Sequence, residues 1–209
     1  MRFCVDKDFV HTMLRFIITF VILFIAVPHV ASQQSESAAV VAQPHVDPDA
    51  YQIYAVLLAA QSEKFYVIRS EMTYGPDVTE SGIKGAREFT KVWGTALADY
   101  VAKLHEKRML NRDFPLDVPY KVVAPAEITE LFKSSVENGW RAFGAQYPGA
   151  RGYYWFSPVG FDKTKTHAIL QMNNACGGLC GYGSPHFLEK TSGKWHEVTV
   201  KATFSVWAS

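Results

Sequence analysis

The stretch Cys176-Gly177-Gly178-Leu179-Cys180-Gly181-Tyr182-Gly183-Ser184 lies near the C-terminus, between two runs of residues that are typical of β-strands. It places two cysteines and four glycines within nine residues, and no other part of the chain is so chemically particular. Before it, residues 167–172 alternate in hydropathy, which is the period-2 pattern of a strand with two different faces. The stretch therefore predicts a tight connection between two neighbouring strands.

The residues around this connection predict more β-structure. Residues 153–156 are a continuous aromatic run, residues 185–190 continue the second strand, and Ser192-Gly193 is typical of a tight hairpin. A last strand follows, in which alternate apolar residues share one face: Val198, Val200, Ala202, Phe204 and Val206. Because connections this short favour antiparallel neighbours, we expect the last third of the chain to form an antiparallel β-meander of about four strands.

Upstream of the meander the sequence predicts helices. Asp47-Pro48-Asp49 combines an N-cap acid with a proline at the first helical position, so a helix begins there and ends near Gln61. Residues 65–71 predict a strand, and residues 120–123 a short extended piece. The strongest helical signal is an apolar stripe with i, i+3, i+4, i+7 spacing, made of Phe89, Val92, Trp93, Ala96, Leu97, Tyr100, Val101 and Leu104.

A further helix is predicted to begin at Pro125 and to be interrupted at Gly139, and its apolar face continues as far as Pro148-Gly149. Taken together, the helices precede the strands along the chain. This order indicates an α+β fold, with N-terminal helices packed on the C-terminal antiparallel meander.

The N-terminus carries the pattern of a signal peptide. Residues 16–27 form a twelve-residue run after Arg15 that is apolar except for Thr19, and Val30-Ala31-Ser32 offers small residues before a cut at Gln33. Asp6 and Asp8 fit such a signal poorly, so translation begins at either Met1 or Met13. We expect a signal peptide over residues 1–32, a flexible linker over 33–46 and a single α+β domain over 47–209. An uncleaved signal anchor stays open as the alternative.

Export determines the charge expected of the mature chain. The whole chain has 21 Lys and Arg and 20 Asp and Glu, of which the signal removes three and two, so 18 of each remain. A neutral domain lacks the basic surface that nucleic-acid binding needs. The sequence therefore predicts a secreted or periplasmic monomer that binds no nucleic acid and has no stable membrane insertion after cleavage.

The cysteines point to a disulfide. Cys4 is removed with the signal, which leaves Cys176 and Cys180 as the only pair in a chain that enters an oxidising compartment. Gly177 and Gly178 can adopt the conformations that a tight ring requires. We therefore predict that Cys176 and Cys180 are bonded to each other.

Four kinds of chemistry compete for this loop. A phosphate cradle at Gly178, Gly181 and Gly183 would need a helix where a strand follows. Zinc would need four ligands, whereas the two cysteines are joined at best by His167 or His186. Catalytic dithiols usually have C-x-x-C spacing at a helix N-terminus, and the spacing here is one residue longer. Ser184 with His186 lacks a G-x-S-x-G motif and a recognisable acid. We predict no metal and no cofactor.

The last part of the chain resembles an uncharacterised group of exported bacterial proteins. The resemblance is carried by Trp140-x-x-Phe143-x-x-x-Tyr147-Pro148, by Gly152, by Ser157-x-Val159-Gly160-Phe161-Asp162, by the C-G-G-L-C-G-x-G core at 176–183 and by Gly193-Lys194-Trp195. In the group the second motif has the form S-x-V-G-F-[DN]. The resemblance implies export and the hairpin loop, and it supplies no activity and no catalytic residue.

The leading hypothesis is a non-catalytic binding or envelope-associated module whose partner is a protein or a small ligand. Its recognition surface would be the loop 174–187, through Gly177, Gly178, Leu179, Gly181, Tyr182, Gly183, Ser184 and His186. The simpler alternative is that this loop is only a well-made turn. The competing class is an exported enzyme, either a thiol-disulfide oxidoreductase at Cys176 and Cys180 or a hydrolase that uses Ser184 and His186.

Overall fold

The structure is a computed structural model, and it describes residues 46–73, 87–104, 106–111, 113–200 and 207–208. The predicted signal peptide and all but the last residue of the predicted linker lie outside the described residues, as do Ala202, Phe204 and Val206 of the expected last strand.

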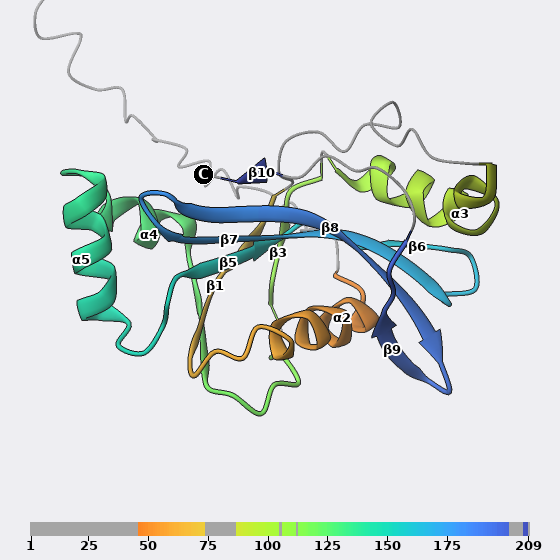
Figure 1. The fold of residues 1–209 in the computed structure, drawn as a ribbon, viewed down its shortest axis with the longest axis horizontal. Coiled ribbons are helices and arrows are strands. Elements are labelled where there is room, and N and C mark those ends of the chain that lie inside the picture. The colour runs from red at the N-terminus through yellow and green to blue at the C-terminus, as the bar shows by residue number, and fades with distance from the viewer. Residues whose placement is uncertain (1–45, 74–86, 105, 112, 201–206, 209) are drawn as a thin grey trace, which may run out of the picture. The chain divides into compact units, whose positions relative to one another are not determined.

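Within the described residues, eight strands form the main sheet, in the order β10-β8-β7-β5-β1-β4, with β6 paired to β7 and β9 paired to β8 (Figure 1). Their bounds are β1 Tyr66–Arg69, β4 Tyr120–Val123, β5 Tyr153–Phe156, β6 Gly160–Phe161, β7 His167–Gly177, β8 Cys180–Thr191, β9 Lys194–Glu197 and β10 Trp207–Ala208. A separate two-stranded sheet pairs β2 (Glu71–Met72) with β3 (Arg108–Met109).

The α+β class is confirmed, but the four-stranded antiparallel meander is wrong. The sheet is larger and partly parallel, because β1 runs parallel to both β4 and β5. Only β5, β7, β8 and β9 follow the predicted antiparallel pattern, in which each strand is joined to the next by a short connection or through β6. The chain between β4 and β5 contains two helices and is long enough for a crossover, which is the connection that parallel strands need.

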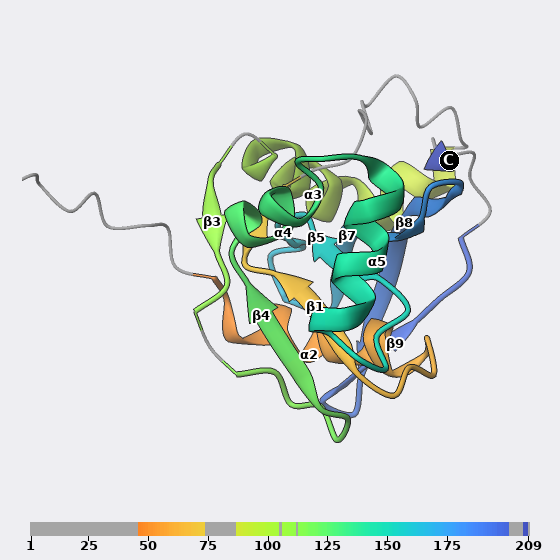
Figure 2. The same ribbon diagram turned by 90° about the vertical axis from the view of Figure 1, so that its left-hand side faces the viewer.

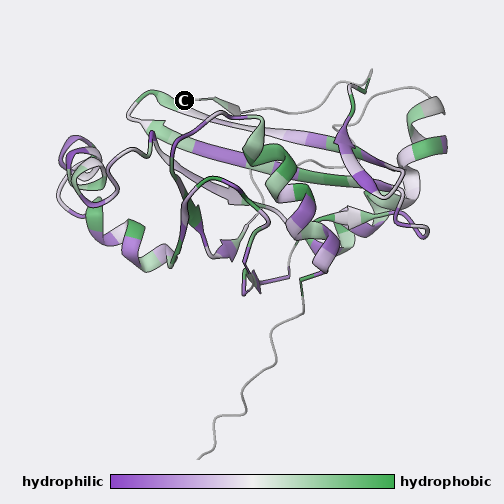
Figure 3. Cartoon of the chain, turned by 90° about the horizontal axis from the view of Figure 1, so that it is seen from below, coloured by the Kyte–Doolittle hydropathy of each residue, from purple (hydrophilic) through white to green (hydrophobic). Residues whose placement is uncertain are grey.

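Four helices lie among the described residues: α2 Pro48–Ala59, α3 Arg87–Lys103, α4 Pro125–Leu131 and α5 Val136–Gln146. They cover both faces of the sheet, not one. Alternate residues of the strands, such as Ile68 and Leu170, pack with α2 on one face. Figure 3 looks onto this face, with α2 in front of the sheet. Their neighbours pack on the opposite face, Ile169 with α3 and Val67 with α4 and α5. Figure 2 shows α3, α4 and α5 on the side of the sheet away from α2. The sheet is therefore a central layer between two helical layers.

Side chains cap the starts of α2 and α5, and one predicted helix interruption is wrong. The Asp47 side chain accepts a hydrogen bond from the Asp49 N–H at 3.0 Å and begins α2, as predicted. The interruption expected at Gly139 is wrong, because the chain breaks between α4 and α5, where Ser135 caps the new helix by accepting from the Asn138 N–H at 3.1 Å. Gly139 lies inside α5 and allows Phe132 to pack closely against the helix.

The apolar stripe of α3 is confirmed in its centre and wrong at its edges. Five of its residues are buried: Phe89, Trp93, Ala96, Leu97 and Tyr100. Val92 and Val101 are 46% and 39% exposed, because the stripe in contact with the sheet is narrower than the sequence pattern. The hairpin between β8 and β9 is confirmed, since Ser192 and Gly193 have φ values of 51° and 77°, the positive values that a tight primed turn requires.

Candidate functional site

The β7–β8 hairpin ends in a covalently closed tip. Cys176 and Cys180 form a disulfide with their Cα atoms 5.0 Å apart, which confirms the predicted bond. Gly178 and Leu179 make the turn between the two strands, and the Leu179 side chain is 92% exposed. The tip thus presents a large apolar side chain to solvent on a short, constrained loop.

A groove of about 570 Å³, here called the tip groove, lies between this tip and α5. It is lined from α5, from the loop after it and from the tip by Val136, Glu137, Trp140, Phe143, Gly144, Ala150, Arg151, Cys176, Gly177 and Gly178. Figure 2 shows α5 in front of the sheet, at the end where the hairpin turns.

Aromatic packing holds the α5 side of the tip groove in place. The Trp140 ring stacks on Tyr153 of β5 with 6.0 Å between centroids and meets Phe132 and Phe143 edge-on. Two charged side chains line the groove as well, Glu137 paired with Arg141 and Arg151 within 3.6 Å of Glu63. The groove is therefore apolar along α5 with one carboxylate and one guanidinium among its lining residues.

The residues of the predicted recognition loop do not all reach this groove. Gly177, Gly178 and Leu179 lie at the tip, while Gly181 and Gly183 are buried in β8, opposite Ala175 and Asn173 of β7. Tyr182 donates a hydrogen bond to the Gln61 side chain at 2.8 Å, just beyond the end of α2. Because side chains alternate along a strand, Tyr182, Ser184 and His186 belong to the α2 face, opposite the face covered by α5.

On the α2 face Ser184 and His186 meet a carboxylate. The Ser184 Oγ lies 3.0 Å from His186 Nε2, and His186 Nδ1 lies 2.6 Å from Glu197 Oε1 of β9. The hydrogen bond with His186 lowers the pKa of Glu197, and partial burial opposes this. The His186 side chain is 12% exposed and that of Glu197 is 43% exposed. The three groups form one continuous hydrogen-bonded chain.

Sequence reasoning missed Glu197, although a signal for it exists. The Ser192-Gly193 turn fixes the register of the hairpin, so Leu188 is opposite Glu197. Residues diagonally related across two strands lie within reach of long side chains. Extending the strand pairing from the predicted turn would therefore have placed Glu197 near His186, although no recognised motif connects them.

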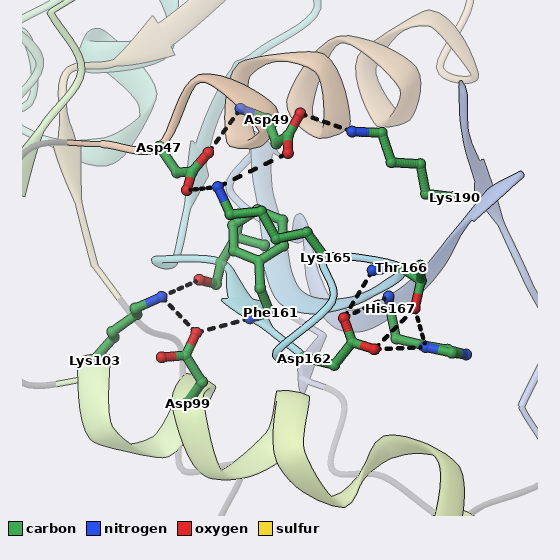
Figure 4. A network of polar contacts seen from close by, with 11 residues as sticks. Asp47, Asp49, Asp99, Lys103, Phe161, Asp162, Lys165, Thr166, His167 and Lys190 are labelled. Carbon is green, nitrogen blue, oxygen red and sulfur yellow. Dashed lines mark hydrogen bonds and ion pairs between the residues drawn. The ribbon is translucent and has the colours of Figure 1, made fainter. Parts of the chain in front are cut away.

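The opposite end of β7 holds a charged clasp, defined by Asp47, Asp49, Asp162, Lys165, His167 and Lys190 (Figure 4). Lys165 pairs with Asp47, and Lys190 donates to Asp49 at 3.0 Å, so both lysines tie α2 to the sheet. Asp162 accepts from the backbone N–H groups of Thr166 and His167 at 2.7 and 3.1 Å and closes the turn before β7.

The same hydrogen bonds explain the electrostatics of the clasp. Burial opposes the charged form of Asp162, but hydrogen bonds from His167, Thr166 and Thr164 outweigh it and hold the pKa well below its usual range. Burial likewise opposes a lowered pKa at Asp47, and the hydrogen bonds from Lys165 and the Asp49 N–H prevail. These charges are fully engaged in holding secondary structure together.

The zinc set considered from the sequence is not brought together. His167 lies at the start of β7 and contacts Asp162, whereas Cys176 lies near the end of that strand in a disulfide. Within the part of the chain that the structure describes, no group of three or more His, Cys, Asp and Glu side chains is placed to hold a metal ion. None of the described helices has the length and apolar character needed to cross a membrane.

Comparison of the chain with protein-family models, with curated proteins and with solved structures found no match.

Proposed function

We propose that the protein is an exported binding module that holds an apolar side chain of a partner protein in the tip groove. The observation that carries the proposal is the groove itself, about 570 Å³ in volume between α5 and the disulfide-closed tip. Sites for specific ligands are typically concave, mostly apolar and roughly 300–1,000 Å³ in volume. The tip groove has this size and has Trp140 and Phe143 along one wall.

The exposed side chains beside the groove favour a protein segment over a small molecule. Val136 lines the groove and is 59% exposed, and Leu179, which directly follows the lining residue Gly178, is 92% exposed. A small ligand in the groove would leave Leu179 in water, whereas a peptide chain that inserts one side chain would also cover both of these residues. Exposed apolar groups next to a pocket are typical of protein-protein contact sites.

The construction of the site favours binding without large rearrangement. The disulfide restrains the tip, and the stacking of Trp140 on Tyr153 fixes the opposite wall. A site that is ordered before binding loses less conformational entropy when the partner arrives. The partner is accordingly an exported protein segment with an aromatic or branched aliphatic side chain at its centre.

The test uses the full-length chain, expressed in an exporting bacterial host, and pentapeptides of sequence Gly-Ser-X-Ser-Gly with Trp, Leu or Ala at X. Saturation-transfer NMR measures binding. The Trp and Leu peptides should give transfer signals and the Ala peptide should give none, because only the larger side chains fill the groove. A Leu179→Ser variant should bind roughly tenfold more weakly, the effect of about 1.4 kcal/mol of lost contact.

A matched pair of variants separates the groove from the rest of the surface. Gly144 lines the groove, and a Cβ added there meets nothing within 4 Å, so Gly144→Phe adds a large side chain to the groove lining without a clash at its Cβ. Ala145 is the next residue of α5 and is exposed outside the groove lining, so Ala145→Phe is the control. Binding should be lost in the first variant and kept in the second. Equal signals from both variants, or no signal with any peptide, would overturn the proposal.

A further inference from the structure

We propose that Ser184, His186 and Glu197 form a second site, a serine hydrolase site on the α2 face that cleaves aryl esters of short acids. It is distinct from the tip groove, because its side chains lie on the opposite face of the sheet. None of the three lines that groove. The result of testing one proposal therefore does not decide the other.

The geometry is that of a nucleophile, a base and an orienting acid. The distances from Ser184 Oγ to His186 Nε2 and from His186 Nδ1 to Glu197 Oε1 are 3.0 and 2.6 Å. Both lie in the range of about 2.6–3.2 Å expected of a catalytic hydrogen bond. With its Nδ1–H donated to the carboxylate, the imidazole keeps a free electron pair on Nε2, directed at the serine hydroxyl.

The pairing of β8 with β9 explains why these three residues meet although the sequence around them contains no nucleophile motif. Ser184 and His186 are two residues apart on β8, so both side chains stand on one face. The register of the β8–β9 hairpin brings Glu197 to that face from the next strand. A site on two paired strands is held by backbone hydrogen bonds, which makes its geometry rigid.

Burial suits the three roles. His186 is 12% exposed at its side chain, so its hydrogen bonds are sheltered from water, while Ser184 is half-buried and not enclosed in the core. A His–Glu pair alone would be enough to hold β9 against β8. The serine hydroxyl at the free nitrogen adds nothing that such a structural pair needs, and it is the group that a hydrolase requires.

The reaction balances with water as the only co-reactant. Ser184 Oγ attacks the ester carbonyl carbon and forms a C–O bond while His186 Nε2 takes the hydroxyl proton. The bond to the aryl oxygen then breaks, and His186 returns the proton to the departing phenol. Water, deprotonated by the same nitrogen, attacks the acyl-serine and releases the acid, which restores the serine hydroxyl.

The substrate class follows from the strand environment. Ser184 pairs with Met172 in the β7–β8 ladder, so its backbone N–H is engaged and does not serve as an oxyanion donor. Removing one such donor typically costs about 10²–10³ in rate. Esters with phenolate leaving groups tolerate this loss best, because the leaving group itself carries the developing charge well.

The experiment uses the full-length exported chain with a fluorophosphonate probe and with p-nitrophenyl acetate. Peptide mapping by mass spectrometry should locate the phosphonyl adduct on Ser184 of the wild-type protein, a result that depends on no variant. Ser184→Ala should abolish labelling, and His186→Gln should slow acylation roughly 100-fold, the usual contribution of a general base. His196→Gln is the matched control, because His196 is exposed on β9 and leaves the chain of hydrogen bonds intact.

Glu197→Gln separates a positioning role from a structural one. Glutamine keeps the length and an acceptor for the Nδ1–H, so circular dichroism should be unchanged while the acylation rate falls roughly tenfold through the lost charge. An adduct on another residue, no labelling of the wild type, or labelling of Ser184→Ala at the wild-type rate would overturn the proposal.

Discussion

The two ends of the β7–β8 hairpin are built by different means. At the start of β7 the charged clasp ties the strands to α2 through Lys165 and Lys190, and α3 packs closely against β6 there. At the tip a disulfide closes the turn, and Leu179 projects into solvent beside an apolar groove. At the clasp end, ion pairs join parts of the chain that are distant in sequence, whereas at the tip the turn is closed by a disulfide between residues four apart.

The difference indicates which end of the hairpin has exposed apolar side chains. In the clasp the carboxylates of Asp47, Asp49 and Asp162 accept hydrogen bonds or ion pairs from within the chain. At the tip the two cysteines close the turn, and the neighbouring side chains of Leu179 and Val136 are exposed to solvent. We therefore expect changes at the clasp end to alter stability and changes at the tip to alter binding.

The largest expected effect is at Trp93, which packs under the clasp end. Its ring lies edge-on to Phe187 and to His167, with centroids 5.2 and 4.9 Å apart, and it is 5% exposed. Trp93→Ala should lower the free energy of unfolding by about 3–5 kcal/mol, the usual cost of truncating a large buried aromatic side chain. Urea denaturation followed by circular dichroism measures it.

The matched change at the tip is Leu179→Ala, which removes an apolar side chain that is 92% exposed. It should leave the free energy of unfolding within about 0.5 kcal/mol. If both variants shift the urea midpoint equally, the contrast between the two ends is wrong.

A smaller effect is expected at Gly160 in β6. A Cβ there would lie 2.4 Å from the Ala96 carbonyl oxygen and from the Tyr100 backbone, so α3 approaches β6 only because the residue is glycine. Gly160→Ala should destabilise by about 1–3 kcal/mol, since α3 has to move away. The midpoint of thermal unfolding reports it.

Gly178 at the tip is the control for this change. A Cβ at Gly178 would first meet the Val136 side chain at 3.7 Å, which is ordinary contact. Gly178→Ala should therefore fall within about 0.5 kcal/mol of the wild type. A tip variant that is as destabilised as Gly160→Ala would show that the tip is also under packing constraint.

Local features of this fold could be predicted from the sequence. The cap at Asp47, the turn at Ser192-Gly193 and the disulfide each depend on residues that are neighbours in the chain, so composition and spacing define them. The buried centre of the α3 stripe follows the same logic, because helical periodicity is set within a few turns.

Long-range pairing could not be predicted in the same way. The parallel contact of β1 with β4 joins Tyr66 to Tyr120, and no local signal in either short strand indicates the partner. The tip groove exists only because α5 packs through Trp140 onto Tyr153, a tertiary contact. Of the α2-face chain, Ser184 and His186 were found from their proximity in sequence, while Glu197 needed the register of the hairpin.

The disulfide restrains the tip and not the whole hairpin. Closing so short a ring contributes about 2 kcal/mol in the chain-entropy description of cross-links. Reduction should therefore loosen residues 175–181 and leave the clasp end folded. Hydrogen exchange with mass spectrometry, before and after reduction, should show faster exchange at the tip alone, and uniform loss of protection along β7 would mean that the ends are not independent.

The smallest effect, and the one with a pH signature, is expected at Asp162. Its pKa is lowered in the folded protein, because hydrogen bonds from His167, Thr166 and Thr164 outweigh the effect of burial. A lowered folded-state pKa stabilises the fold above the unfolded value of about 4, and this stabilisation is lost as the pH falls further. Asp162→Asn keeps an acceptor but not the charge, so it should cost roughly 1 kcal/mol at neutral pH.

The comparison with the wild type should therefore depend on pH. The difference in unfolding free energy should be largest near pH 7 and shrink as the pH falls below about 4, because the Asp162 carboxyl then binds a proton in the unfolded wild-type chain before it does so in the folded one. Glu137→Gln beside the tip groove is the control, because its side chain is 84% exposed and its pair with Arg141 lies on the surface. Such pairs contribute about 0–1 kcal/mol, so that variant should follow the wild type at every pH. A difference at Asp162 that stays constant with pH would mean that its geometry, and not its charge, holds the clasp end.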